Sequence, residues 1–128
     1  MKEIKEVQGP QLKKVMLEPV QISIEPISRM LLIKQGENEI RLTRDQVNNM
    51  TRLRNHEYES DVFTSTITPR NKFQLADNGN IIATCKNDYS DDTIVIQNTK
   101  RYDDLQRIIN FVDRNKPRIA WARDFRRK

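Results

Sequence analysis

Residues 116–128 combine aromatic side chains with closely spaced cations, which are residue types that can bind a polyanion. Two aromatics, Trp121 and Phe125, stand among six cations. These cations are Lys116, Arg118, Arg123, Arg126, Arg127 and Lys128. Cations neutralise phosphates and release their counterions, whereas aromatic faces stack on unpaired bases, and proteins that grip a single strand use both. The pattern predicts a binding surface for nucleic acid, with single-stranded DNA favoured and RNA as the second choice.

The distribution of charge also favours a polyanion partner. Residues 114–128 carry seven cations and the single anion Asp124, a net +6, which leaves −1 of the total of +5 for residues 1–113. A near-neutral body with one cationic tail favours a polyanion more than a generally basic surface would. The simpler alternative is a tail that only improves solubility.

Two further roles are open for the tail. Ile119, Trp121 and Phe125 could anchor a short helix back on the domain, because Trp121 and Phe125 have the i, i+4 spacing of one helical face. The tail could also dock on a partner protein, since Trp and Arg are common anchors of protein interfaces. In that case the chain would be a protein-interaction module, such as an inhibitor or an assembly subunit.

Cations in the body could extend the binding surface, if the fold brings them to the same face as the tail. We assign three of them to the candidate site, namely Arg41, Arg44 and Arg52. Three others are Arg54, Arg70 and Lys72. The aromatics Phe63, Phe73 and Tyr89 are expected to pack in the core or in loops rather than to stack on bases.

Nothing in the sequence indicates an enzyme. His56 is the only histidine and has no Ser or Cys signature beside it. Cys85 stands in an apolar run, where a small buried hydrophobe is expected rather than a thiolate nucleophile. Zinc sites use about four Cys or His ligands, and the Asp88, Asp91 and Asp92 cluster is better explained by a solvated turn than by a hard cation. We therefore predict no catalytic residues, no metal and no cofactor.

The tail follows a strand and a helix. Residues 92–97 form the β-branched run typical of a half-buried strand. The spacing i, i+3, i+4, i+7 of one helical face follows at Leu105, Ile108, Ile109 and Val112. Asn98 and Thr99 offer side-chain oxygens that can cap a new helix, so we predict a helix over residues 99–114.

The rest of the body alternates strand and turn signals. Strands are predicted at residues 20–24, 30–33, 39–42, 62–66, 73–75 and 81–86. Thr43 and Gln46 match the capping box of a second helix, predicted over residues 43–55. The Asn78-Gly79 pair is a strong hairpin signal.

These elements predict one antiparallel α+β domain over residues 20–114. Residues 30–53 and 81–112 share the order strand, strand, helix, which indicates a pseudo-repeat in the order of elements rather than in residue identity. A flexible N-terminal arm (residues 1–19) precedes the domain, and the basic tail (residues 115–128) follows it.

The segment from Glu39 to Val47 resembles the end of the module used by Whirly-type and transcriptional-coactivator single-strand-binding proteins. The resemblance implies four antiparallel strands ahead of a helix, with nucleic acid lying along the sheet. This chain differs in one respect: those families carry basic segments ahead of the module, whereas the strongest one here follows the last helix.

The length of the chain and its single cysteine indicate its domain organisation and its compartment. A chain of 128 residues fits one domain, and no apolar run approaches the roughly 18 residues of a membrane span. The lone Cys85 cannot form an internal disulfide, which favours a reducing compartment, cytoplasmic or nucleoid-associated. The sequence therefore predicts an intracellular nucleic-acid-binding accessory protein that supports transcription or replication, in a viral or phage context. A protein partner and self-association are both open.

Overall fold

The computed structural model describes residues 2–4, 15–66, 69–86 and 91–125. Its strands are β1 (Lys2–Ile4), β2 (Val15–Leu17), β3 (Gln21–Ile24), β4 (Leu31–Gln35), β5 (Asn38–Leu42), β6 (Val62–Thr64), β7 (Asn71–Leu75), β8 (Ile81–Lys86) and β9 (Asp91–Ile96). Its helices are α1 (Arg44–Arg54), α2 (Asp104–Arg114) and the short 3-10 helices η1 (Lys116–Arg118) and η2 (Ala122–Phe125).

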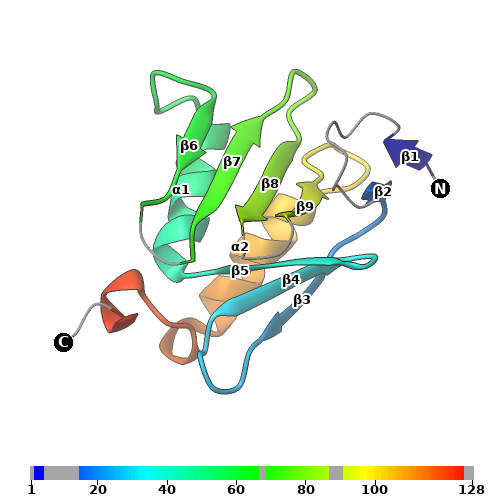
Figure 1. Ribbon diagram of the computed structural model, residues 1–128. Coiled ribbons are helices and arrows are strands. Elements are labelled where there is room, and N and C mark those ends of the chain that lie inside the picture. The colour runs from blue at the N-terminus through cyan, green and yellow to red at the C-terminus, as the bar shows by residue number, and fades with distance from the viewer. Residues whose placement is uncertain (1, 5–14, 67–68, 87–90, 126–128) are drawn as a thin grey trace.

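The strands form antiparallel sheets in the orders β1-β2, β3-β4-β5 and β6-β7-β8-β9. This confirms the predicted α+β class, and each of the two larger sheets is followed by a helix, as the pseudo-repeat requires. Figure 1 shows both α-helices behind the sheets, with the three-stranded sheet running across the ends of β7, β8 and β9.

Register explains how one core serves both sheets. Ile22, Ile33 and Ile40 are aligned across β3, β4 and β5. In the four-stranded sheet the aligned row is Phe63, Phe73, Ala83 and Ile94. Because alternate residues of a strand point to opposite faces, each row lies on one face. Both rows join the apolar cluster that also contains Leu53 of α1 and Ile108 of α2.

The side chain of Gln35 joins the two sheets. Its Nε2 donates to the carbonyl of Val95 at 2.9 Å and to that of Glu18 at 2.7 Å, while its Oε1 accepts from the Val95 N–H at 2.8 Å. Gln35 is only 2% exposed. The amide thus pairs with the N–H and the carbonyl of Val95 in β9, as the backbone of a neighbouring strand would.

We expect Gln35→Leu to lower the free energy of unfolding by roughly 1–3 kcal/mol, because it leaves buried backbone groups of Val95 without partners. Urea unfolding measures the change. The control is Gln74→Leu, at an exposed position of β7. Equal effects of the two substitutions would contradict the bridging role of Gln35.

The helix starts were predicted with unequal success. The capping box is confirmed: Thr43 Oγ1 accepts from the Gln46 N–H at 3.4 Å, and Gln46 Oε1 accepts from the Thr43 N–H at 3.3 Å. The predicted start at residue 99 was wrong, since α2 begins at Asp104 with Asp103 as its N-cap. The Thr99 hydroxyl accepts instead from the Tyr102 N–H at 3.0 Å. Residues 98–103 therefore form a turn that delays the helix.

Candidate nucleic-acid interface

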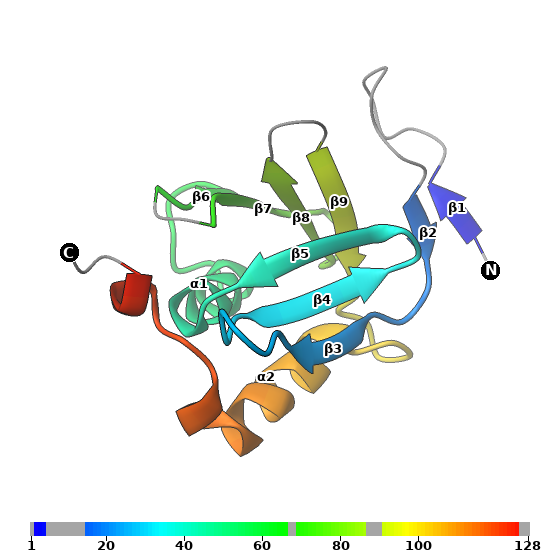
Figure 2. The same cartoon turned by 60° about the horizontal axis from the view of Figure 1, so that its bottom comes forward.

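The first part of the basic tail is packed into the domain. Ile119 is 2% exposed and belongs to the apolar core. The neighbouring Ala120 donates its N–H to the Arg29 carbonyl at 2.9 Å, and its carbonyl accepts from the Arg44 N–H at 3.0 Å. These bonds hold the tail between the loop that joins β3 to β4 and the first turn of α1 (Figure 2).

Two carboxylates hold the next residues. Asp45, in the first turn of α1, accepts from the Ala122 N–H at 2.7 Å. Asp124 accepts from the Trp121 N–H at 2.7 Å. Each bond places a carboxylate on a backbone donor, a charge-assisted contact stronger than a neutral one. The backbone on both sides of the Trp121 side chain is therefore fixed.

Two arginines lie against the Trp121 ring. The guanidinium carbon of Arg44 is 4.1 Å from the ring centroid, and that of Arg123 is 5.2 Å away. Arg44 also donates from Nη1 to the Lys116 carbonyl at 3.1 Å. Trp121 itself is half-buried. Arg44, Trp121 and Arg123 form what we call the Arg–Trp cluster, in which an aromatic ring and two cations from separate elements share one place on the surface.

Of the other predicted residues of the tail, Lys116 and Arg118 lie in η1 and Phe125 ends η2. Lys116 lies 3.8 Å from the Asp113 carboxylate, and Arg118 donates to Asn115 Oδ1 at 3.2 Å. Phe125 is 40% exposed. Arg126, Arg127 and Lys128 lie outside the described residues.

Arg29 is a neighbour of the tail that the sequence reasoning missed. Its Nη2 lies 3.9 Å from Asp124 Oδ2, and its carbonyl accepts from Ala120. Arg29 lies two residues before the start of β4 and has a positive φ of 61°. Nothing in the spacing of Arg29 connects it with a segment some ninety residues later, so only the fold could place it here.

Arg41 and Arg52 do not join the cluster. Arg41, on β5, bonds Glu25 at 2.7 Å and Glu39 at 3.0 Å. Hydrogen bonds from Ser28 and then from Arg41 lower the pKa of the Glu25 carboxyl, while the bond to Glu25 raises the pKa of Arg41.

Arg52 lies near the opposite end of α1 from Arg44. A rise of 1.5 Å for each residue puts the two arginines about 12 Å apart along the helix. Arg52 pairs with Glu57 at 3.3 Å, and its guanidinium carbon is 5.0 Å from the Tyr58 ring centroid.

Cys85 and His56 are described residues of types that can take part in catalysis or metal binding. Burial raises the pKa of the Cys85 thiol, and the nearby Asp92 charge raises it further, so the thiolate is disfavoured. His56 is exposed beyond the end of α1. In the described ranges no group of three or more His, Cys, Asp or Glu residues is placed to hold a metal ion.

A membrane-spanning helix and a known relative were both sought for this chain. In the part of the chain that the structure describes, no helix has both the length and the apolar character needed to cross a lipid bilayer. No protein-family model, no curated protein and no solved structure matches the sequence or fold.

Proposed function

We propose that the protein binds nucleic acid, preferentially single-stranded DNA and with little sequence specificity, as an accessory factor in transcription or replication. One observation carries this proposal: the Trp121 ring stands with the guanidinium groups of Arg44 and Arg123 within 5.2 Å of its centroid. The surrounding tail carries the net +6 of residues 114–128.

The chemistry of the cluster fits an unpaired strand. Arginine contacts phosphate oxygens through its planar fork of donors, and a tryptophan ring offers a surface on which any base can stack. Stacked bases inside a duplex do not expose their faces, which favours a single strand. Phosphate contacts and stacking carry little sequence information, so binding is expected to tolerate most sequences.

The outward faces of the sheets are less suited to a polyanion. In the three-stranded sheet, Glu39 pairs with both Lys34 and Arg41. Of the outward side chains Lys72, Gln74, Ile82 and Thr84, which lie where the structure describes the side chains of β7 and β8, only Lys72 is a cation. The charge balance therefore favours the tail over the sheets as the phosphate-binding surface.

The resemblance to Whirly-type and coactivator modules is a proposal of the same kind. The segment that carries the resemblance, Glu39 to Val47, covers most of β5 and the start of α1, and β5 belongs to the three-stranded sheet β3-β4-β5. A resemblance in the order of elements does not assign function, because one fold can host many functions. The proposal therefore depends on the Arg–Trp cluster.

Fluorescence of Trp121, the only tryptophan, tests the proposal directly. Saturating single-stranded oligonucleotide is expected to change the emission of Trp121, because a base then stacks on its ring. Trp121→Ala should lose roughly 1–3 kcal/mol of binding free energy. The ring is half-buried, so the loss of folding stability should be smaller than the roughly 3–5 kcal/mol of a fully buried tryptophan.

The matched control is Tyr102→Ala. Tyr102 is 43% exposed and has the Arg101 guanidinium carbon 5.7 Å from its ring centroid, but it lies in the turn before α2. This substitution should leave oligonucleotide affinity unchanged. Unchanged Trp121 emission on an oligonucleotide shown independently to bind would rule out the stacking role.

The alternative is a protein-interaction module, and exposed apolar side chains favour it as the second candidate. Phe125 is 40% exposed and Ile27, in the loop between β3 and β4, is 95% exposed. Such side chains can anchor a protein partner. A protein that shows no response to oligonucleotide, but whose Phe125→Ala variant loses a partner in a pull-down, would have this second function.

A further inference from the structure

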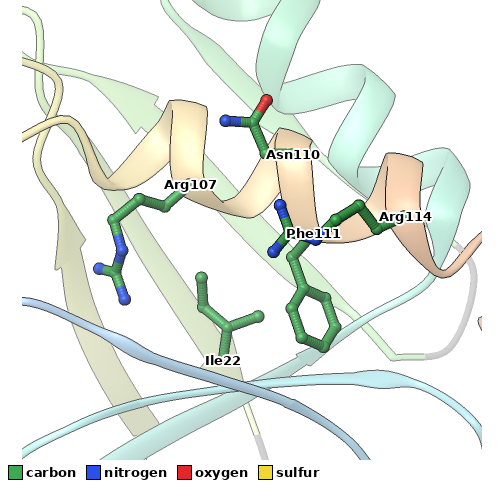
Figure 3. Close-up of a pocket in the computed structure, with 5 residues that line it drawn as sticks. All are labelled: Ile22, Arg107, Asn110, Phe111 and Arg114. Atoms are coloured by element: carbon green, nitrogen blue, oxygen red, sulfur yellow. The ribbon is translucent and has the colours of Figure 1, made fainter.

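A second group of arginines lines a pocket between α2 and the edge strand β3. The pocket has a volume of about 220 Å³ and is lined by Ile22, Arg107, Asn110, Phe111 and Arg114. The four helix residues are spaced i, i+3, i+4 and i+7, which places them along one face of α2. Figure 3 shows Arg107 and Arg114 on the two sides of the space next to Ile22.

The two arginines of this pocket differ in what holds them. Arg107 Nη1 bonds Asp104 Oδ1 at 2.8 Å, and Arg107 Nη2 donates to the Val20 carbonyl at 3.0 Å. Arg114 is exposed and makes no hydrogen bond or ion pair through its side chain with another described residue. Arg107 is therefore positioned in advance, while the guanidinium donors of Arg114 are available to a ligand.

The remaining lining residues, Ile22, Asn110 and Phe111, carry no charge. Ile22 and Phe111 supply apolar walls, and the lining residues include no carboxylate. Asn110 Oδ1 accepts from Gln106 at 3.0 Å, and in Figure 3 the Asn110 side chain points away from Ile22. A site with two guanidinium groups and no acid in its lining favours an anion with several acceptor oxygens, of which phosphate is the best match.

We infer that this pocket binds a phosphate of the same nucleic-acid strand that contacts the Arg–Trp cluster. The inference rests on the proposed function and extends it, because it adds Arg107 and Arg114 to the binding surface. The chain itself connects the two sites: Arg114 ends α2, and η1 with Lys116 and Arg118 leads to Trp121. The strand would thus run from η2 past η1 onto the face of α2 (Figure 2).

Oligonucleotide length separates the two sites. Single-strand-binding folds cover roughly 4–16 nucleotides, so an oligomer of about four should occupy the cluster alone, whereas one of about sixteen should reach both sites. For the longer oligomer, Arg114→Gln should reduce the slope of log affinity against log salt concentration by roughly 0.7, the contribution of one phosphate contact. For the shorter oligomer it should change nothing.

Two further variants control this measurement. Arg114→Lys keeps the positive charge and should keep the salt slope of the wild type. Arg101→Gln removes an exposed arginine in the turn before α2 and should leave the slope unchanged for both lengths. Urea unfolding of each variant verifies that the fold is intact.

The possible failures are distinguishable. If the wild type binds both oligomers and Arg114→Gln keeps the wild-type slope for both, the inference is overturned and the proposed function stands. An equal loss of slope for both lengths also overturns it, because the pocket would then belong to the primary contact and not to an extension. If the wild type binds neither oligomer, the proposed function and the inference fail together.

Discussion

Ile119→Ala is expected to lower the free energy of unfolding by roughly 2–5 kcal/mol, the cost of removing a large aliphatic side chain from a packed core. Ile119 lies in the basic tail yet is 2% exposed and contacts the apolar core. Its backbone neighbour Ala120 also bonds the first turn of α1 and the loop before β4. Losing Ile119 should therefore loosen the platform that carries Trp121, and urea unfolding measures the cost.

The matched control is Ile27→Ala, the same substitution at a residue that is 95% exposed. Surface substitutions of this kind usually change stability by no more than about 0.5 kcal/mol. Similar effects at both positions would show that the tail contributes no core packing. Ile119→Val, which removes one methyl group, should give an intermediate loss of roughly 0.5–1.5 kcal/mol.

The triple variant Arg44→Gln, Arg118→Gln and Arg123→Gln is expected to reduce the salt dependence of oligonucleotide binding strongly. If each arginine neutralises one phosphate, the slope should fall by roughly 2, at about 0.7 for each contact on a single strand. Affinity should fall most at low salt, because exposed charges act most strongly there. Titrations of a labelled oligomer at several salt concentrations measure both quantities.

A second triple variant keeps the same net charge and removes cations elsewhere. It combines Arg54→Gln, Arg70→Gln and Lys72→Gln, at the end of α1 and on or beside β7. Its affinity and slope should fall much less than those of the first triple variant. If the second triple variant lost more affinity and slope than the first, the nucleic acid would bind at the four-stranded sheet. Equal losses would indicate an unspecific response to net charge.

Most strands and the first helix could be predicted because their signals are local. The hairpin between β7 and β8 contains Asn78 and Gly79, and Gly79 has a φ of 96°, which only glycine adopts easily. The Thr43 and Gln46 capping box acts over three residues. Such interactions join residues close in sequence, so the residue types reveal them.

The start of α2 was not predictable in the same way, because two cap candidates compete. Asn98 and Thr99 are typical cap residues, as is Asp103. The Asn98 N–H bonds Asn80 Oδ1 at 3.0 Å, and Asn98 forms a bridge with Asp103. A contact with the distant loop between β7 and β8 thus holds Asn98 outside the helix, and Asp103 becomes the cap.

The sequence by itself determined the charge of the tail, its aromatic spacing and the apolar rows of the α+β fold, since these follow from residue type and short spacing. Only the tertiary structure decided which cations are neighbours. It brings Arg44 to Trp121 and pairs Arg41 with Glu25 and Glu39. The physical reason is that ion pairs and ring contacts depend on distances of a few ångströms between side chains, and packing around a shared core sets those distances.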